Sequence, residues 1–294
     1  MNIYFKFNHL HKVVMAIFSF LLVNILIAQS GNSLELRYLK NSVYFIRITN
    51  VQVYFQQTQE VIDISKYGLS WSGTGFLLNN GDFITARHVI QPWRFIDECR
   101  SWNLDNEKGE AILAYVNNAE IAGGSVEIIY EARSADGDLF TFSNKDLVFD
   151  QSGDKLFDCD KEGSNKQLKI CPITNNASDW AKLTLNNKKG LLKLNRDISR
   201  SLSQETPIYG YGYSYGQFLQ AFNQDRIAPI LIKGELVQDR TMNGMINITA
   251  NALAPGSSGG PMMIKNANGD YEVIGIISRG FIQVQQLVPA YEIR

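Results

Sequence analysis

Two adjacent serines lie in a loop rich in glycine and proline near the end of the chain. The segment reads Ala254-Pro255-Gly256-Ser257-Ser258-Gly259-Gly260-Pro261, with apolar segments on both sides. Glycine adopts positive φ at little steric cost, so such a loop can expose a hydroxyl and turn nearby amides toward the same point. Gly, Ser and Pro also dominate ordinary surface turns. The rest of the chain must therefore distinguish a nucleophilic serine from a simple turn.

A serine hydroxyl is a poor nucleophile until a base, usually a histidine oriented by a carboxylate, removes its proton. His9 and His11 belong to an N-terminal segment that we expect to be removed, which leaves His88 as the single histidine. Any imidazole-assisted chemistry at Ser258 must then use His88. A lone histidine at a strand end is, however, usually an ordinary core or surface residue.

The loop also satisfies the G-x-S-x-G pattern of α/β-hydrolases, but their histidine follows the serine. No histidine follows His88, and no alternation of strands and helices surrounds the loop, so this fold is excluded. The carboxylate is sought between His88 and Ser258. Asp138, Asp146 and Asp150 belong to polar turns, whereas Asp179 opens the alternating segment 181–185 and is the preferred partner.

Residues 1–28 have the layout of a secretory signal peptide. Lys6 and Lys12 precede an apolar run of 16 residues, which is short for a bilayer span, and cleavage is expected between Ala28 and Gln29. We therefore expect an exported protein, periplasmic or secreted, with no stable membrane span after cleavage. Removal leaves 26 basic against 29 acidic residues, a net charge of -3, which gives no electrostatic footprint for nucleic acid.

The cysteine spacing gives no support for a metal site, and no cofactor is expected. Cys159 and Cys171 could close a small loop as a disulfide, which would leave Cys99 unpaired. The sequence leaves this pairing open.

Short strands separated by turns at regular spacing predict an all-β fold. Asn79-Asn80-Gly81-Asp82 predicts a hairpin whose second strand leads directly into Thr85-Ala86-Arg87-His88. No long amphipathic helix is predicted, and 150–167 is expected to be a polar loop. Strands are expected at 43–48, 51–55, 71–78, 83–86, 111–116, 126–132, 139–149, 181–185, 206–213, 227–237, 245–253, 271–280 and 283–288.

Three of these motifs resemble those of the chymotrypsin-type (trypsin-like) serine protease superfamily. Thr85-Ala86-Arg87-His88-Val89 is similar to its T-A-x-H motif, 256–261 is similar to G-x-S-G-G-P, and 178–183 is similar to the strand that carries its aspartate. Gly73-Thr74-Gly75-Phe76 and Val273-Ile274-Gly275-Ile276 are closest to HtrA-like protease domains. The resemblance covers about 40–290, and 91–175 align only loosely.

The resemblance implies two six-stranded Greek-key β-barrels with the active site between them. The mature domain would span 29–294, with barrels at about 40–185 and 190–294. Ser258 would be the nucleophile, His88 the general acid/base and Asp179 the residue that orients the imidazole. The amides of Gly256 and Ser258 would form the oxyanion hole. The substrate would be bound by Ala252, Ser278, Arg279 and Gly280.

Two departures from the family pattern limit what the resemblance implies. Ser257 stands where many activated members have an aspartate that pairs with a new N-terminus, so activation of that kind is not expected. Only 36 residues follow Ser258, too few for the PDZ domain of HtrA-like proteins.

The expected function is that of an exported serine endopeptidase that cleaves a protein or peptide substrate through an acyl-enzyme intermediate. Ala252 lies six residues before Ser258, so no carboxylate there selects Lys or Arg, and Gln285 and Leu287 are expected to narrow the pocket. Small or medium apolar P1 residues are therefore expected. The alternative is a binding or adhesion module that keeps the protease fold with unused catalytic residues. The sequence indicates neither the physiological substrate nor the oligomeric state.

Overall fold

The computed structural model describes residues 36–55, 58–63, 71–95, 108–161, 164–172, 176–216, 227–238, 244–280 and 284–294. Residues Lys40–Arg294 form one compact unit, to which everything below refers, and Met1–Leu39 form another, of which 36–39 are helical. The predicted signal peptide and Cys99 lie outside the described residues. None of the helices in the described ranges is long and apolar enough to cross a membrane.

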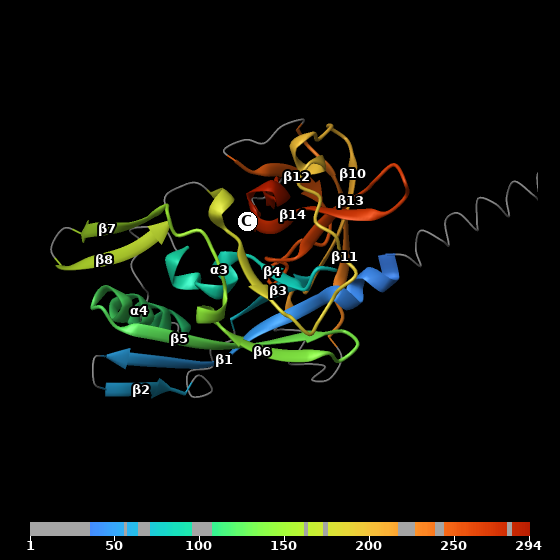
Figure 1. The fold of residues 1–294 in the computed structure, drawn as a ribbon. Coiled ribbons are helices and arrows are strands. Elements are labelled where there is room, and N and C mark those ends of the chain that lie inside the picture. The colour runs from blue at the N-terminus through green and yellow to red at the C-terminus, as the bar shows by residue number, and fades with distance from the viewer. Residues whose placement is uncertain are drawn as a thin grey trace, which may run out of the picture. The chain divides into compact units, whose positions relative to one another are not determined.

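The first half of the unit is built on an antiparallel sheet in which the described residues form seven strands. Six of them follow in the spatial order β6-β5-β1-β3-β4-β9, and β2 pairs with β1 (Figure 1). Their bounds are β1 Val43–Phe55, β2 Thr58–Ile62, β3 Ser72–Leu77, β4 Asp82–Thr85, β5 Ser125–Ser134, β6 Leu139–Ser143 and β9 Ala181–Thr184. Strand β5 shows why the sheet forms, because buried residues alternate with partly exposed ones along its length, as one-sided burial requires.

The two ends of this sheet meet at a single bridge. Val148, just beyond β6, exchanges two backbone hydrogen bonds with Lys182 of β9, at N–O distances of 2.7 and 2.9 Å. The sheet therefore curls toward closure without the continuous ladder of a fully closed barrel.

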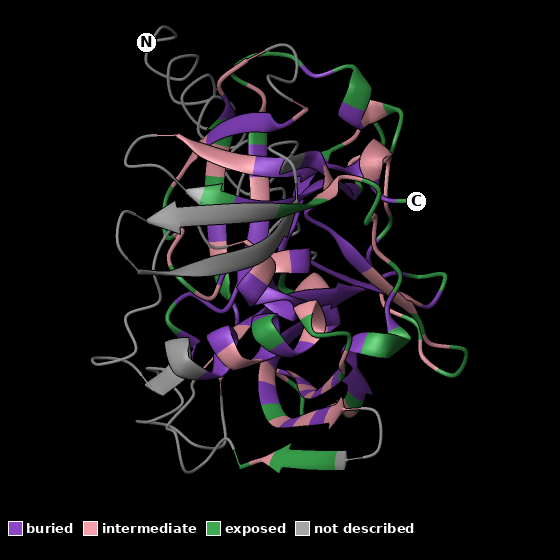
Figure 2. Ribbon diagram, turned by 90° about the vertical axis from the view of Figure 1, so that its left-hand side faces the viewer, coloured by how far each residue is buried: buried purple, intermediate pink, exposed green. Residues whose placement is uncertain are grey.

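The second half is a closed barrel of six strands in the order β10-β11-β12-β15-β14-β13. Their bounds are β10 Pro207–Gly212, β11 Ile230–Leu236, β12 Ile246–Ala250, β13 Pro261–Lys265, β14 Tyr271–Gly280 and β15 Gln285–Pro289. Its interior is filled by aliphatic side chains, among them Ile208, Ile232, Ile248, Ile274 and Leu287, all fully buried. Figure 2, coloured by burial, shows long buried stretches along the strands. The closed barrel beside a curled sheet confirms the predicted all-β, chymotrypsin-like double-barrel class.

The prediction of a strand at 111–116 was wrong, because these residues belong to helix α4 (Lys108–Ile121). Ile112, Leu113, Val116 and Ala119 are buried, at the spacing of one helical face. A short apolar run does not distinguish strand from helix by periodicity alone.

The prediction of a polar loop at 150–167 was also wrong. Strands β7 (Asp154–Lys161) and β8 (Ser164–Pro172) pair as an antiparallel hairpin outside both sheets. Lys155 and Leu156 of β7 are exposed, so this part of the strand lacks the apolar alternation that reveals a half-buried strand.

The hairpin register also decides the cysteine pairing that the sequence left open. Cys159 lies opposite Gln167, and Cys171 lies opposite Lys155. Four residues along a strand correspond to about 13 Å, whereas bridged cysteines have Cα atoms less than about 7 Å apart. In this register the Cα atoms of the two cysteines lie farther apart than those of a bridged pair.

The other helices among the described residues are single turns, and one of them carries His88. Helix α3 (Arg87–Ile90) follows β4 directly, and η2 (Pro92–Arg94) follows α3. The predicted hairpin before it is present, since β3 pairs with β4 across Asn79, Asn80 and Gly81. The other 3₁₀ turns are η1 Lys40–Ser42, η3 Asn144–Asp146, η4 Asn176–Ser178, η5 Ile198–Arg200 and η6 Ala290–Glu292.

Candidate active site

His88 and Asp179 lie in direct contact at one end of the first sheet. His88 is the second residue of α3, and Asp179 lies between η4 and β9, which pairs with β4. The Nδ1 atom of His88 lies 2.8 Å from Oδ2 of Asp179. The backbone N–H of His88 donates to Oδ1 of the same carboxylate, also at 2.8 Å. One carboxylate thus fixes both the ring and the backbone of His88.

The carboxylate of Asp179 is fully buried and accepts a third hydrogen bond from the Ser278 hydroxyl. Burial by itself would raise the pKa of Asp179, but the electrostatic attraction to His88 and the hydrogen bonds from His88 and Ser278 outweigh it. The pKa of Asp179 is therefore lowered below its ordinary value, and the group is ionised at neutral pH. Because a carboxylate only accepts, the Nδ1 atom of His88 must carry the hydrogen, which leaves Nε2 free to act as a base.

Ser278 is directed at Asp179 by an irregularity in β14. The pairing of β14 with β15 shifts register at this point, since Ile277 lies opposite Leu287 and Arg279 lies opposite Gln286. Ser278 is the extra residue of this bulge. Bulges near functional sites commonly redirect a side chain.

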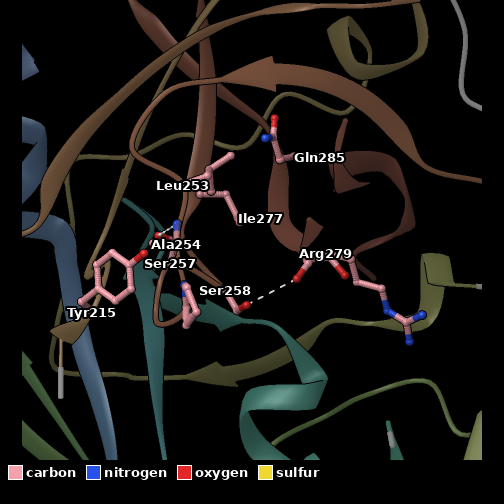
Figure 3. A pocket seen from close by; sticks show the side chains of 10 residues that line it. Tyr215, Leu253, Ala254, Ser257, Ser258, Ile277, Arg279 and Gln285 are labelled. Carbon is pink, nitrogen blue, oxygen red and sulfur yellow. Dashed lines mark hydrogen bonds between the residues drawn. The ribbon is translucent and has the colours of Figure 1, made fainter. Parts of the chain in front are cut away.

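The candidate nucleophile Ser258 lies on the other side of the same Ser278. Its hydroxyl donates to the carbonyl oxygen of Ser278 at 3.3 Å (Figure 3). In the described part of the chain, the Ser258 hydroxyl forms this bond and none with His88. The structure therefore brings His88 and Asp179 into direct contact. Ser258 is connected to Asp179 through Ser278, whose hydroxyl donates to Asp179 and whose carbonyl accepts from Ser258.

Within the described structure, the loop that carries Ser258 holds two amides without a protein partner. The three neighbouring amides that can donate do so to backbone carbonyl groups (Ser257, Gly259 and Gly260). Among the described residues, the amides of Gly256 and Ser258 donate to no protein group. Gly256 has φ +96°, and a Cβ there would lie 2.5 Å from the carbonyl oxygen of Tyr213. Only glycine therefore fits the backbone shape that leaves these two amides available.

Sequence reasoning missed Thr74 of β3, which joins the sheet to this loop. Its side chain is fully buried, and its hydroxyl donates to the Gly256 carbonyl at 2.7 Å and accepts from the Tyr213 amide at 2.9 Å. The Thr74 amide donates to the Ser258 carbonyl at 2.8 Å. The G-x-G pattern around Thr74 indicated a strand. It could not indicate the hydrogen-bond partners of Thr74, because these lie 139 or more residues away in sequence.

We expect Thr74→Val to lower the free energy of unfolding by about 2–4 kcal/mol. Valine has a similar shape but no hydroxyl, so the Gly256 carbonyl and the Tyr213 amide would be buried without their partner. Urea unfolding followed by tryptophan fluorescence measures the change.

The matched control is Thr49→Val in β1, because Thr49 is exposed and its hydroxyl donates to the Ile129 carbonyl. This surface substitution should change the unfolding free energy by no more than about 0.5 kcal/mol. Equal effects of the two substitutions would contradict a bridging function for Thr74.

Ser257 was also missed as a structural element of the loop. It is buried, and its hydroxyl lies 2.6 Å from that of Ser214. The Ser214 hydroxyl donates to the Ala252 carbonyl at 2.6 Å, so Ser257 must donate to Ser214. Ser257 thus braces the loop through its bond to Ser214, whereas the Ser258 hydroxyl bonds to the Ser278 carbonyl.

A pocket of about 710 Å³ lies beside Ser258 (Figure 3). Its lining includes Leu253, Pro255 and Ile277, with Tyr215 and Gln285 as larger polar groups. Ser278 and Arg279, for which substrate contacts are a prediction, also line it, but Arg279 extends its guanidinium away from Leu253 and Ile277.

Other predicted pocket residues lie elsewhere. Ala252 is exposed and does not line the pocket, although its neighbour Leu253 does. Leu287 lies in the core of the closed barrel, so it does not narrow the pocket, whereas Gln285 does line it. Gly280 ends β14 opposite Gln285. In the described ranges, no group of three or more His, Cys, Asp or Glu side chains is placed to hold a metal ion.

Comparison with known proteins adds little to this geometry. No family model matches the chain, and no curated protein matches it. Among solved structures, the chain is similar to the crystal structure of Deg5, with 15% sequence identity over 89% of this chain and 90% of that chain, and a TM-score of 0.43. At this distance the function must be inferred from the site itself.

Proposed function

We propose that this protein is an exported serine endopeptidase that acts through His88, Asp179 and Ser258. The observation that carries the proposal is the buried carboxylate of Asp179, which binds both the backbone N–H and the Nδ1 atom of His88. A buried ionised group is costly unless it is fully hydrogen-bonded. A carboxylate used in this way fixes the tautomer and orientation of a single imidazole, as general-base catalysis requires.

In the proposed reaction, Ser258 Oγ attacks the carbonyl carbon of the scissile peptide bond while Nε2 of His88 accepts the hydroxyl proton. The tetrahedral intermediate collapses when His88 returns the proton to the leaving amine, and an acyl-enzyme remains. Water then attacks the ester, again with His88 as base, and releases the acid product and Ser258.

Two features prepare the site for this chemistry. The unpartnered amides of Gly256 and Ser258 are the donors for the oxyanion, and one such donor is worth about 2.7–4 kcal/mol in the transition state. The Ser258 hydroxyl must rotate from the Ser278 carbonyl toward His88 when substrate binds. Catalytic hydrogen bonds are often absent or long before substrate is bound.

The substrate proposed for this site is an extended peptide with a small or medium apolar P1 side chain. Leu253, Pro255 and Ile277 offer apolar contacts, and no acidic residue lines the pocket among those described. The bulged edge of β14 at Ser278 and Arg279 would pair with the peptide backbone. Export follows from the signal-like segment at 1–28 and belongs to the same proposal.

One observation favours a second candidate, a protease-fold binding module without catalysis. The Ser258 hydroxyl is bonded to the Ser278 carbonyl and not to His88. If this orientation were permanent, Ser258 would not be activated.

An alkyl fluorophosphonate probe distinguishes the two candidates. Such probes phosphonylate a serine only when a neighbouring base activates it, so we expect labelling of the wild type and none of Ser258→Ala. Intact-protein mass spectrometry measures the adduct. Folded wild-type protein that remains unlabelled would rule out the peptidase and favour the module.

A further inference from the structure

The residue before His88 is a fully buried arginine. Arg87 Nη1 and Nη2 donate to the two carboxylate oxygens of Asp154, at 2.9 and 2.6 Å. Nη1 also donates to the Asp150 carbonyl at 2.8 Å, and Nε donates to Gln91 at 2.8 Å. Four of the five N–H groups of a guanidinium are thus accounted for.

The surroundings of Arg87 complete a closed compartment. Its guanidinium carbon lies 5.0 Å from the centre of the Phe149 ring and 5.8 Å from that of Phe95. Asp154 is the first residue of β7 and is itself only 11% exposed. Burial of a guanidinium is tolerated only when its partners are held in place, so this compartment ties α3 rigidly to the start of the β7–β8 hairpin.

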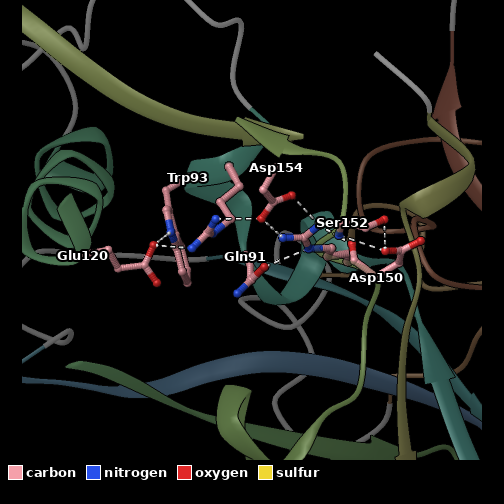
Figure 4. Close-up of polar contacts among 8 residues, drawn as sticks. Gln91, Trp93, Glu120, Asp150, Ser152 and Asp154 are labelled. Atoms are coloured by element: carbon pink, nitrogen blue, oxygen red, sulfur yellow. Dashed lines mark hydrogen bonds and ion pairs between the residues drawn. The ribbon is translucent and has the colours of Figure 1, made fainter. Parts of the chain in front are cut away.

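A second arginine extends the same network to α4. Arg94 of η2 donates to Asp154 at 2.8 Å and to Glu120 of α4 at 2.9 Å, and the Trp93 indole also donates to Glu120. Figure 4 shows this chain of contacts running from Glu120 through Asp154 to Asp150. We call Arg87, Arg94, Glu120 and Asp154 the arginine network.

The loop that presents Asp154 is also ordered. The Asp150 carboxylate accepts from the amide of Ser152 at 2.9 Å and from its hydroxyl at 2.6 Å. This local turn holds the Asp150 carbonyl and the Asp154 carboxylate toward the same guanidinium. Strand β8 in turn contacts α4 and η2.

Helix α3 is a single turn, and the two consecutive residues Arg87 and His88 are bound on different sides of it. Arg87 is held by the hairpin and His88 is held by Asp179. A helix of four residues has little stability of its own, so its orientation depends on such anchors. A catalytic side chain must be held within about 0.5 Å of its productive position, and this precision depends on the packing and hydrogen bonds of its neighbours.

We propose that Arg87 and Asp154 are positioning residues that fix the His88 imidazole, so that the β7–β8 hairpin controls catalysis from outside the site. The expected effect of this positioning on catalytic rate rests on the peptidase function proposed above. The hairpin is therefore part of the working enzyme and not a passive insertion.

The test uses Asp154→Asn and Arg87→Lys in the full chain, which weaken the paired contact without opening a large cavity. The matched control is Glu272→Gln in β14. Glu272 is also a nearly buried carboxylate, and it accepts from Lys193 at 2.7 Å and from Asn195, but it belongs to the closed barrel. Thermal unfolding midpoints allow the loss of stability to be matched across the three variants.

Asp154→Asn and Arg87→Lys should lower kcat and the rate of fluorophosphonate labelling roughly tenfold to a hundredfold, which is the size of effect that a small misplacement of a reacting group produces. KM should remain unchanged, because neither residue contacts the pocket. Glu272→Gln should change neither quantity. A loss of kcat that merely follows the loss of stability in all three variants would overturn the proposal.

Proton NMR of protein labelled with ¹⁵N-histidine keeps the test independent of activity. The Nδ1–H proton of His88, bonded to Asp179, should give a resonance far downfield of ordinary amides. We expect Asp154→Asn and Arg87→Lys to broaden or shift this resonance and Glu272→Gln to leave it unchanged. If the wild type does not react with the fluorophosphonate probe but the His88 resonance still responds to both substitutions, the peptidase function is refuted and the positioning function is supported. If neither substitution changes the resonance, the positioning function is refuted.

Discussion

Replacement of Ser258 by alanine should lower kcat by about 10⁶-fold, and the further replacement of His88 should cost almost nothing more. The reason is that the two side chains act as one unit, because the imidazole has no proton to accept once the hydroxyl is gone. His88→Ala alone should therefore be nearly as damaging as Ser258→Ala. Initial rates of cleavage of a fluorescently labelled, denatured protein, measured at high enzyme concentration, provide the comparison.

The neighbouring serine supplies the control for this experiment. Ser257 also lines the pocket, but its hydroxyl is buried and bonded to Ser214, so Ser257→Ala should keep kcat within about tenfold of the wild type, a difference of 1.4 kcal/mol. If the fold-losses of kcat from Ser258→Ala and His88→Ala multiply in the double variant, the two side chains do not act as one unit. A greater loss from Ser257→Ala than from Ser258→Ala would show that the wrong serine has been assigned.

The contact between His88 and Asp179 could be predicted from sequence because each residue is marked by a local signal. The Asn-Gly hairpin placed His88 at the end of β4, and the alternating pattern that begins at Ala181 placed Asp179 at the start of β9. Since β4 and β9 are paired antiparallel, the end of one strand lies beside the start of the other. A pairing of adjacent strands therefore converts two local signals into one site.

The supports of the site could not be predicted in the same way. Thr74, Ser214 and Arg87 are ordinary polar residues in sequence, and arginine is rarely fully buried unless it is paired. Their partners lie far away along the chain: Gly256 for Thr74, and Asp154 for Arg87. Only the folded structure shows that each of these side chains is buried and joins distant segments of the chain by hydrogen bonds.

The secondary structure of 111–116 and 150–167 was misassigned for a related reason. Helix α4 is 14 residues long, and its apolar part contains Ile112, Tyr115 and Val116, which are residue types that strands favour. The β7–β8 hairpin lies outside both sheets, with exposed side chains near the start of β7. Sequence periodicity reports burial against a core, so the exposed start of this hairpin gives a weak signal.

Replacement of Asp179 by asparagine should lower kcat by about 10⁴-fold while the protein stays folded. The asparagine oxygen can still accept from the backbone N–H of His88, as Oδ1 of Asp179 does. The Ser278 hydroxyl, which now donates to the carboxylate, can rotate to accept from the new amide instead. The asparagine side chain should therefore remain in the position of Asp179. The loss of kcat then comes from the changed hydrogen-bonding of His88 and not from a displaced side chain.

The catalytic loss follows from the tautomer of His88. The ionised Asp179 requires a hydrogen on Nδ1, whereas the NH₂ group of asparagine would donate to Nδ1 and move the hydrogen to Nε2. An Nε2 atom that carries a hydrogen cannot accept the Ser258 proton, so fluorophosphonate labelling should slow in parallel with kcat. ¹⁵N NMR of the imidazole nitrogens reports the tautomer directly, because the protonated and unprotonated nitrogens differ widely in chemical shift.

Asp138→Asn is the matched control, because Asp138 was a competing carboxylate in the sequence and binds Tyr44 and Lys188 instead of His88. It should leave both kcat and the His88 tautomer as in the wild type. An Asp179→Asn variant that keeps more than about a tenth of the wild-type kcat would mean that the buried carboxylate merely braces α3, since a tenfold loss amounts to only 1.4 kcal/mol. His88 would then be oriented by its backbone contact and by the arginine network alone.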